Sequence, residues 1–188
     1  MQQRNLYSYS FNDGEYIEFR LLTGDDSIEE LTQLLHKSYK VLADMGLKYV
    51  AATQDHSTTL NRARSAYKCF IGIYKHKIVS TISLYSPKPL DESSWYSKDF
   101  VAKIGQFAVT PELQKYGIGS KMMDIVEEEA GKIKNVREIA LDTAETAVHL
   151  IELYKKRGYR YVETVQWDVT NYKSVILSKS LYSNISQW

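Results

Sequence analysis

A glycine-containing segment between a predicted strand and a predicted helix is the first candidate for chemistry. Residues 114–120 read Gln-Lys-Tyr-Gly-Ile-Gly-Ser. The first N–H groups of a helix have no partner within the helix and carry partial positive charge, so such a turn binds phosphate. Glycine at 117 and 119 lets the main chain approach a diphosphate without a Cβ in the way, and Lys115 adds a charge. The segment therefore predicts an anion site for a phosphorylated ligand.

Two common nucleotide motifs do not fit these residues. A P-loop ends in Gly-Lys-Ser/Thr, whereas Gly119 is followed directly by Ser120. A dinucleotide-binding fingerprint needs a third glycine where Met122 stands. The segment therefore favours neither of these two nucleotide sites.

The pattern Q/R-x-x-G-x-G/A does fit, and with two further segments it resembles the GNAT superfamily of N-acetyltransferases. Residues 104–111, Ile-Gly-Gln-Phe-Ala-Val-Thr-Pro, are similar to the family's fourth strand, and residues 153–159, Leu-Tyr-Lys-Lys-Arg-Gly-Tyr, are similar to its LYEKxGF segment. The resemblance spans residues 17–179. It implies a GNAT-like α+β fold, with a mixed, mostly antiparallel six- to seven-stranded sheet and helices on both faces. It also implies an acyltransferase with acetyl-CoA as co-substrate.

The resemblance assigns the acetyl-CoA contacts as well. In the family the fourth and fifth strands diverge, and the pantetheine arm lies in the gap. Val109 would hold the pantetheine through its main chain. The N–H of Phe107 or Ala108 would face the thioester carbonyl, where one preorganised donor contributes about 3 kcal/mol as the oxyanion develops. The diphosphate is expected on Gln114 and on the main-chain amides of Lys115, Tyr116, Gly117, Ile118, Gly119 and Ser120.

Tyr154 matches the tyrosine that many family members place beside the cofactor sulfur. It is expected to be the general acid, which returns a proton to the leaving sulfur. A tyrosine of pKa about 10 is a weaker acid than a thiol of pKa about 8.5, so its main contribution is expected to be a hydrogen bond. Its helical spacing also suits an ordinary core tyrosine. The family's usual asparagine earlier in this helix is replaced by Ala147, so the contact of that side chain is not carried over.

Attack on a thioester needs a neutral amine. An ε-amine of pKa about 10.4 is almost entirely protonated at neutral pH, whereas an α-amine of pKa about 7.8 is partly neutral. The position in the fourth strand that is acidic in several relatives is Gly105 or Gln106 here. The candidates for a base or water relay therefore lie elsewhere, with Glu145 preferred among Asp142, Glu145, His149 and Asp168. Each also suits a helix cap or a solvated surface position.

The acceptor pocket is expected between the first helix, the loop after it and the last strands. Its predicted contacts are Tyr39, Met45, Tyr49 and Trp167, with Leu42, Gln54 and Trp95 nearby. An aromatic lining suits a small amine, an amino acid or a peptide end, and we expect direct attack on acetyl-CoA in a ternary complex. Acetylation of a protein N-terminus or lysine, and a non-catalytic acyl-CoA sensor, are the alternatives. His36 and His56 have no partner at ligand spacing, so no metal is expected.

Hydrophobic periodicity predicts the elements that position these residues. Strands are expected at residues 16–22, 67–74, 78–85, 100–109, 137–141, 161–169 and 172–179. Ser27 and Glu30 form a capping-box pattern for a first helix that ends at Gly46. Further helices are expected at 57–66, from Gly117, and at 147–157, with Gly158 as a left-handed end. Residues 86–99 are predicted as a long surface loop.

Composition places these elements in one domain. The 188 residues divide into a polar N-terminal leader over residues 1–14, a single N-acetyltransferase domain over 15–181 and a C-terminal tail over 182–188. The 24 basic and 23 acidic side chains give a net charge of +1, so no nucleic-acid partner is expected.

The same composition bears on location and cysteine chemistry. Because no apolar run suits a membrane span or a signal core, a cytoplasmic protein without a membrane partner is expected. Cys69 is the single cysteine and lies in an apolar run, so it is expected to be a buried core residue. A homodimer that covers edge strands is a further hypothesis.

Overall fold

The computed structural model describes residues 7–11 and 14–182, which form one eight-stranded sheet in the order β1-β2-β3-β4-β5-β6-β8-β7. The strands are β1 (Tyr7–Phe11), β2 (Glu15–Leu21), β3 (Lys68–Tyr74), β4 (Lys77–Tyr85), β5 (Val101–Val109), β6 (Glu138–Ala144), β7 (Arg160–Gln166) and β8 (Lys173–Ser180). The helices are α1 (Ile28–Asp44), α2 (Val50–Thr53), α3 (His56–Ser65), α4 (Ile118–Gly131) and α5 (Val148–Lys156), with a 3-10 turn at Pro111–Leu113. Neighbouring strands are antiparallel except β5 and β6. The predicted α+β class is confirmed.

The sheet has one strand more than the six to seven that the sequence predicted. The extra strand, β1, lies within the segment assigned to a polar leader and pairs antiparallel with β2. Its alternate residues are tyrosines and serines, so the inward side chains do not stand out as apolar, although Tyr7 and Tyr9 pack on the core and Phe11 is 8% exposed. Residues 1–6, 12–13 and 183–188, which include most of the predicted tail, lie outside the described residues.

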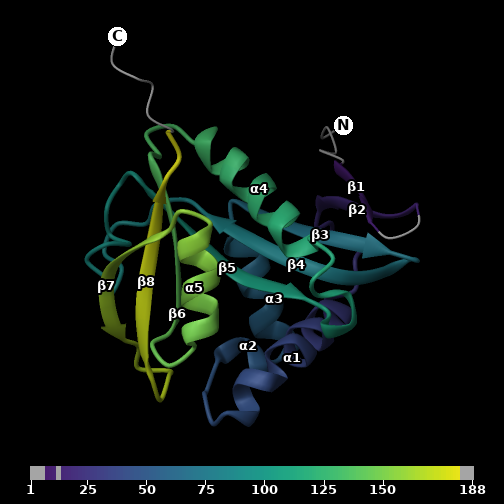
Figure 1. Ribbon diagram of the computed structural model, residues 1–188, viewed down its shortest axis with the longest axis horizontal. Helices are drawn as coiled ribbons and strands as arrows, with labels where there is room; N and C mark the ends of the chain where they lie inside the picture. The colour runs from purple at the N-terminus through teal and green to yellow at the C-terminus, as the bar shows by residue number, and fades with distance from the viewer. Residues whose placement is uncertain (1–6, 12–13, 183–188) are drawn as a thin grey trace.

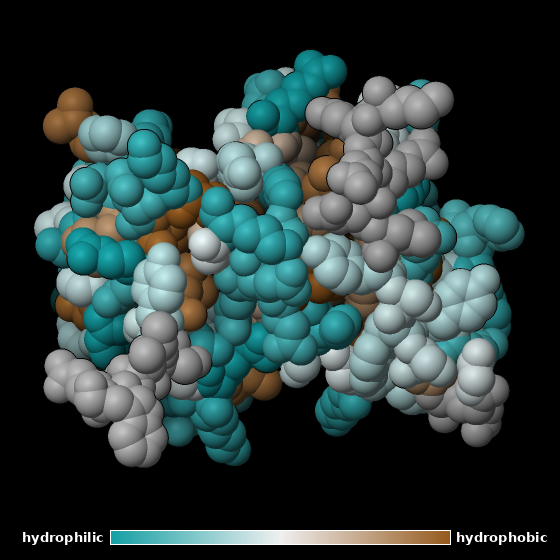
Figure 2. Space-filling view, turned by 90° about the horizontal axis from the view of Figure 1, so that it is seen from above, coloured by the Kyte–Doolittle hydropathy of each residue, from teal (hydrophilic) through white to brown (hydrophobic). Residues whose placement is uncertain are grey.

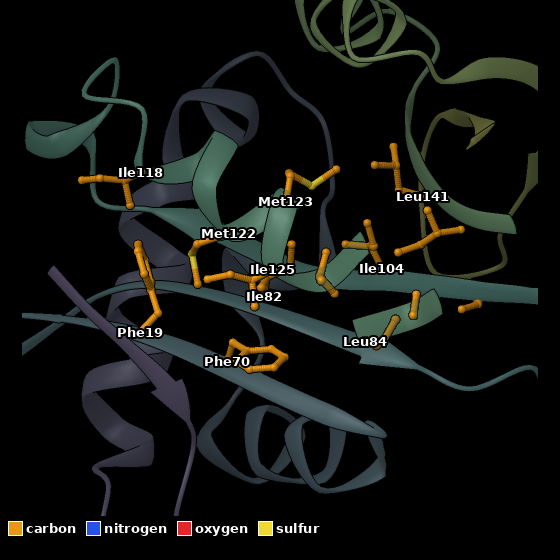
Figure 3. Close-up of a cluster of buried hydrophobic side chains, with 14 of the residues drawn as sticks. Phe19, Phe70, Ile82, Leu84, Ile104, Ile118, Met122, Met123, Ile125 and Leu141 are labelled. Atoms are coloured by element: carbon orange, nitrogen blue, oxygen red, sulfur yellow. The ribbon is translucent and has the colours of Figure 1, made fainter. Parts of the chain in front are cut away.

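The helices cover both faces of the sheet, with α4 and α5 on one face and α1, α2 and α3 on the other (Figure 1). The largest cluster of buried side chains lies between the central strands and α4, where Phe19, Phe70 and Ile82 meet Met122 and Ile125 (Figure 3). Burial of each such side chain contributes about 1.5–3 kcal/mol. The surface seen from above is mostly hydrophilic, with small apolar areas between polar side chains (Figure 2). The side chains buried between α4 and the central strands fix the position of α4 relative to β5.

Several predicted boundaries follow from local chemistry. The Ser27 hydroxyl accepts a hydrogen bond from the Glu30 N–H at 3.1 Å, which caps α1 as expected. The Glu30 carboxylate does not complete the capping box but accepts from the Ile78 N–H of β4 at 3.0 Å. Gly158 has φ 93°, the left-handed conformation predicted after α5. These contacts hold the ends of α1 and α5 in place beside the sheet.

β5 and β6 are paired only over their first residues. Their parallel register runs from Val101–Glu138 to Lys103–Ala140. Beyond Lys103 the two strands have no paired residues, although β5 stays paired with β4 to Val109 and β6 stays paired with β8 to Ala144. The sheet therefore divides between β5 and β6 (Figure 1), and the unpaired main-chain groups of both strands face this gap.

Candidate active site

The turn before α4 presents main-chain N–H groups at the start of that helix. Gly117 is the N-cap residue with φ 79°, and no side chain of the described residues caps the helix. A Cβ at Gly117 would lie 2.3 Å from the Tyr9 hydroxyl, so both the conformation and the close contact require glycine. The first amides, from Ile118 to Ser120, therefore have no intrahelical partner. This geometry suits an anion, and the anion site itself stays a prediction.

This anion site lies directly beside the end of β5. A Cβ on Gly119 would lie 3.3 Å from the Phe107 ring and 3.6 Å from a Val109 methyl group. The Gln114 amide donates to the Val109 carbonyl at 3.1 Å. The turn and the strand are thus held together, and a ligand on the helix amides can extend into the gap.

The main-chain groups of Phe107 and Val109 point into the gap. Thr110 N–H donates to the Val79 carbonyl of β4 at 2.8 Å, and alternate residues of an antiparallel strand face opposite neighbours. The Phe107 and Val109 carbonyls accordingly accept from outside the sheet, from the Tyr39 hydroxyl at 3.0 Å and the Ser38 hydroxyl at 3.1 Å. Of the two residues predicted to face the thioester, this geometry favours Phe107 over Ala108.

A β-bulge interrupts β5 at the same level. Gln106 has φ 47°, and the β4–β5 register shifts beside it. Ile104 and Phe107 both contact the core under α4. The two residues between them, Gly105 and Gln106, therefore face the opposite side of the sheet, which α1, α2 and α3 cover (the α1–α3 side). Gln106 is 2% exposed, and its amide makes no hydrogen bond to a described residue. The sequence marked this position in two ways, as a polar residue inside an apolar strand and as the position that is acidic in several relatives.

Two tyrosines bridge the gap on the α1–α3 side. Tyr39 of α1 is bonded to β5 through the Phe107 carbonyl, and the Tyr49 hydroxyl accepts from the Ala144 N–H of β6 at 2.9 Å. Their ring centroids lie 5.4 Å apart, and Tyr172 packs on Tyr49 at 4.8 Å. Burial raises the pKa of all three hydroxyls. Neutral tyrosines from α1, from the loop after α1 and from the bend before β8 thus line the opening between the strands.

A family model described as the acetyltransferase (GNAT) family matches residues 28–159, which contain the gap, the anion site, Tyr39 and Tyr49. The chain belongs to the GNAT acetyltransferases. It is 30% identical, over 142 residues, to S-(2-succino)cysteine N-acetyltransferase of Bacillus subtilis (strain 168), a match that covers 75% of this chain and 82% of the relative.

Solved structures share the GNAT fold. The GNAT domain of S. lividans PAT has a TM-score of 0.69 at 14% identity and covers 93% of this chain and 96% of its own. A GNAT family acetyltransferase from Elizabethkingia anophelis with acetyl-CoA bound has a TM-score of 0.60 at 17% identity and covers 87% of this chain and 97% of its own. At these identities the likeness shows the fold alone.

Tyr154, which the GNAT resemblance predicted as the acid, lies on α5 and is 9% exposed. Burial raises the pKa of its hydroxyl, and the neighbouring Tyr39, Tyr49 and Asp142 raise it further. The hydroxyl makes no hydrogen bond to any residue that the structure describes. It is therefore a protonated donor at neutral pH, close enough to the tyrosines at the gap to be affected by them.

Of the four predicted bases, Asp142 on β6 is the one whose charge acts on Tyr39, Tyr49 and Tyr154 in the described part of the chain. Its carboxylate accepts from the Tyr96 hydroxyl at 3.0 Å and the Trp167 indole N–H at 3.2 Å. The two rings are stacked, with centroids 6.2 Å apart and 9° between their planes. The negative charge contributes to the raised pKa of Tyr39 and Tyr154. Trp167, predicted to contact the acceptor, thus also orients a carboxylate.

The other predicted bases are at the surface. Glu145, His149 and Asp168 are exposed. The Glu145 main-chain N–H donates to the Lys173 carbonyl at 2.8 Å, in the turn after β6. No hydrogen bond to a described residue joins these three side chains to the tyrosines. The role of Glu145 stays a prediction.

A cavity of about 600 Å³ opens beside Tyr49 and Gln54, between the end of α1, the following loop and Val169. Met45 is 54% exposed at the end of α1 and does not line this cavity. Gln54 is buried, and its side-chain carbonyl accepts from an Arg62 N–H at 2.7 Å. Sequence reasoning did not single out Arg62, because nothing in α3 marks it as different from its neighbour Arg64.

Three further features complete the description. Within residues 7–11 and 14–182, no three His, Cys, Asp or Glu residues are grouped to hold a metal ion. No helix of that part of the chain is both long and apolar enough to cross a bilayer. Cys69 is buried, and burial raises the pKa of its thiol, which disfavours the nucleophilic thiolate.

Proposed function

We propose that this chain transfers the acetyl group of acetyl-CoA to a primary amine of a small molecule or amino acid, by direct attack in a ternary complex. The observation that carries the proposal is the gap between β5 and β6, which has an uncapped helix start at its end and tyrosines across its opening. The N-terminus of α4 suits the diphosphate, and the strand amides suit the pantetheine and the acetyl oxygen.

In this proposal the acetyl carbonyl lies against the Phe107 N–H. This amide is fixed by the strand, so it needs no reorganisation as negative charge develops on the oxygen. The Val109 N–H holds the pantetheine arm, and the glycines at 117 and 119 admit the diphosphate. Binding then depends on main-chain groups, whose positions are set by the packing of α4 on β5.

Tyr154 is proposed to donate a hydrogen bond to the leaving sulfur. When the tetrahedral intermediate collapses, the C–S bond breaks, and the proton lost by the amine is balanced by the proton that coenzyme A gains. The raised pKa of Tyr154 keeps its hydroxyl protonated for this role. The amine proton requires a base, for which the sequence predicted Glu145 and the position beside the tyrosines favours Asp142.

A small acceptor is favoured by the segment over residues 86–100. Tyr96 from this segment is buried and stacks on Trp167, so the segment covers the α1–α3 side of the sheet at β6. A long protein substrate needs an open groove there. The 30% identical relative is named as an N-acetyltransferase of S-(2-succino)cysteine, a small amino acid. Both observations support a small molecule or amino acid over a protein.

The proposal is tested by incubating the protein with acetyl-CoA and a panel of amines, with coenzyme A release and product mass measured. The panel contains S-(2-succino)cysteine, common amino acids, alkylamines, polyamines and peptides with free N-termini. We expect an N-acetylated product from at least one small amine. Binding of acetyl-CoA without any product across the panel would instead support the sensor alternative.

The ternary mechanism has its own test. The protein is incubated with acetyl-CoA alone, and its intact mass is measured. We expect no covalent acetyl group, since the buried Cys69 thiol has a raised pKa. A stable acetyl-enzyme that passes its acetyl group to the amine would replace direct attack by a two-step mechanism.

A further inference from the structure

Arg62 on α3 is a half-buried cation without a carboxylate partner among the described residues. One of its N–H groups donates to the Gln54 side chain at 2.7 Å, and no described carboxylate lies within the 4.0 Å of an ion pair. Arg20 and Arg157, whose side chains are 19% exposed, pair with Asp26 and Glu127 at 2.7 Å. A guanidinium has five donors in a planar fork, so most of the capacity of Arg62 is unused by described side chains.

A second cation, Lys103 of β5, lies on the same side of the sheet. Its ammonium lies 4.1 Å from the Tyr96 ring centroid and 5.2 Å from that of Trp167. It likewise has no carboxylate within ion-pair distance in the described part of the chain. Contacts with aromatic faces stabilise an ammonium without neutralising it. The Lys103 ammonium thus lies beside Tyr96 and Trp167, the two residues that donate hydrogen bonds to the Asp142 carboxylate.

Tyr85 connects the two cations. It stands opposite Lys103 in the β4–β5 register, and its hydroxyl donates to the Arg62 carbonyl at 3.1 Å. Its ring covers Gly105, where a Cβ would lie 2.9 Å from it. Positions 103 and 105 are two residues apart, so they lie on the same face of β5. Tyr85 therefore lies between Arg62 of α3 and Lys103 of β5, just before the Gln106 bulge.

Arg62 is also close to the gap. Its positive charge opposes the burial effect on the pKa of Tyr39, whose hydroxyl is bonded to the Phe107 carbonyl, and on that of Tyr85. Asp142 is the acidic residue whose charge acts on Tyr39. The α1–α3 side of the gap therefore combines two cations with one carboxylate. That charge pattern is complementary to an amine that carries carboxylates.

We propose that Arg62 and Lys103 each bind a carboxylate of the acceptor, so that the acceptor is an amino acid with an acidic side chain. This inference rests on the proposed function and specifies its substrate class. Arg62 presents a fork that matches a carboxylate in bidentate fashion, whereas Lys103 acts as a point charge. The acceptor amine then lies between the two cations and the gap, on the side of Asp142.

The test compares two acceptors that differ in one charge. S-carboxymethyl-L-cysteine carries two carboxylates, and S-carbamoylmethyl-L-cysteine replaces the side-chain carboxylate by an amide of nearly the same size. We expect kcat/KM to favour the dicarboxylate by about 10- to 100-fold, the range for charge-assisted contacts. S-(2-succino)cysteine and phosphoethanolamine complete the series.

Variants assign the preference to its residues. Arg62→Gln and Lys103→Gln are each expected to reduce the dicarboxylate preference by about 10-fold, mainly through KM, and Arg62→Lys is expected to restore part of it. Arg64→Gln is the matched control, because Arg64 is an exposed arginine on the same helix. The affinity for acetyl-CoA, measured by calorimetry, is expected to stay at the wild-type value in all four variants. The melting temperature is expected to stay at the wild-type value in Arg64→Gln and to fall in Arg62→Gln, which leaves the buried Gln54 side-chain carbonyl without its donor.

The outcomes separate this inference from the proposed function. Acetylation of neutral amines at least as fast as of the dicarboxylate would overturn the inference and leave the acetyltransferase intact. So would an unchanged preference in folded Arg62→Gln and Lys103→Gln, or a preference for phosphoethanolamine. Absence of any acetylated amine would contradict the proposed function itself.

Discussion

The two sides of the β5–β6 gap are built from different parts of the chain. On the α4 side, the candidate cofactor contacts are main-chain groups of one continuous segment, from Phe107 to Ser120. On the α1–α3 side, the candidate acceptor contacts are side chains from separate elements, among them Tyr39, Arg62 and Asp142. The first side needs particular backbone conformations, whereas the second needs particular charges in particular places.

This difference explains what each side tolerates. A main-chain site is insensitive to most side-chain changes but sensitive to a Cβ, as at Gly117. In a side-chain site, substitution of one charged residue changes which ligand is bound, although the fold stays the same. A family that keeps the α4 side and varies the α1–α3 side therefore keeps one acyl donor and changes its acceptor.

Tyr154 of α5 belongs to neither side alone. Loss of its hydroxyl is expected to lower the rate of acetyl transfer more than any other change proposed here. Tyr154→Phe removes the donor to the leaving sulfur, so kcat is expected to fall by about 10²-fold while the protein stays folded. Tyr159→Phe is the matched control, because the Tyr159 ring packs on Tyr154 at 6.0 Å but its hydroxyl donates to Glu127. Unchanged turnover in folded Tyr154→Phe, measured by coenzyme A release, would remove Tyr154 from the mechanism.

The α1–α3 side is tested next, through its carboxylate. Asp142→Asn is expected to lower kcat/KM by about 10- to 100-fold at neutral pH, if the carboxylate accepts the amine proton. The deficit is expected to shrink as pH rises toward the pKa of the amine, because the free amine then needs no base. A pH profile of kcat/KM measures both effects.

The same profile for Glu145→Gln tests the residue that the sequence preferred. Since Glu145 is exposed and its side chain has no hydrogen bond to the tyrosines, we expect a wild-type profile. The reverse pattern, with Asp142→Asn active and Glu145→Gln impaired at neutral pH, would assign the base to Glu145.

The α4 side is tested by adding one methyl group. Gly117→Ala places a Cβ 2.3 Å from the Tyr9 hydroxyl and puts alanine in a left-handed conformation that costs about 1–2 kcal/mol. The affinity for acetyl-CoA, measured by calorimetry, is expected to fall by about 10-fold. Tyr9→Phe in the same background is expected to recover the part due to the clash.

Gly131→Ala provides the control for this substitution. Gly131 lies at the other end of α4, and a Cβ there has no atom within 4 Å. We expect unchanged affinity, since alanine is favourable in a helix. Equal losses in Gly117→Ala and Gly131→Ala would show that the start of α4 has no special part in binding.

A smaller change, in stability and not in activity, is expected at Gln106, on the border between the two sides. Gln106→Met replaces a buried amide that has no hydrogen bond to a described residue by an apolar side chain of similar length. We expect the free energy of unfolding to rise by about 1 kcal/mol, because the desolvation penalty of the amide is removed. Chemical denaturation measures it. A fall in stability would show that the amide has a partner in the folded protein.

The sequence alone determined the α4 side of this protein. Gln114, Gly117 and Gly119 stand within one turn, between a strand and an amphipathic helix. A main-chain site of this kind is encoded by local conformation, which glycine and periodicity reveal. Tyr154 was singled out by the resemblance of a contiguous segment to the family, and its role in the reaction stays a prediction.

Only the tertiary structure decided the α1–α3 side. Arg62 and Lys103 lie on α3 and β5, and no local pattern distinguishes them from solvated charges. Asp142 on β6 was one of four candidate bases, but the sequence preferred Glu145. The packing of α3 and β6 beside β5 decides which of these charges lie on the α1–α3 side of the gap. Strand β1 was missed for a related reason, because its tyrosines and serines become inward and outward residues only when β2 pairs with it. The function of a charged residue or an edge strand depends on the residues that pack against it. Those residues lie far apart in the chain, so only the tertiary structure shows which of them are in contact.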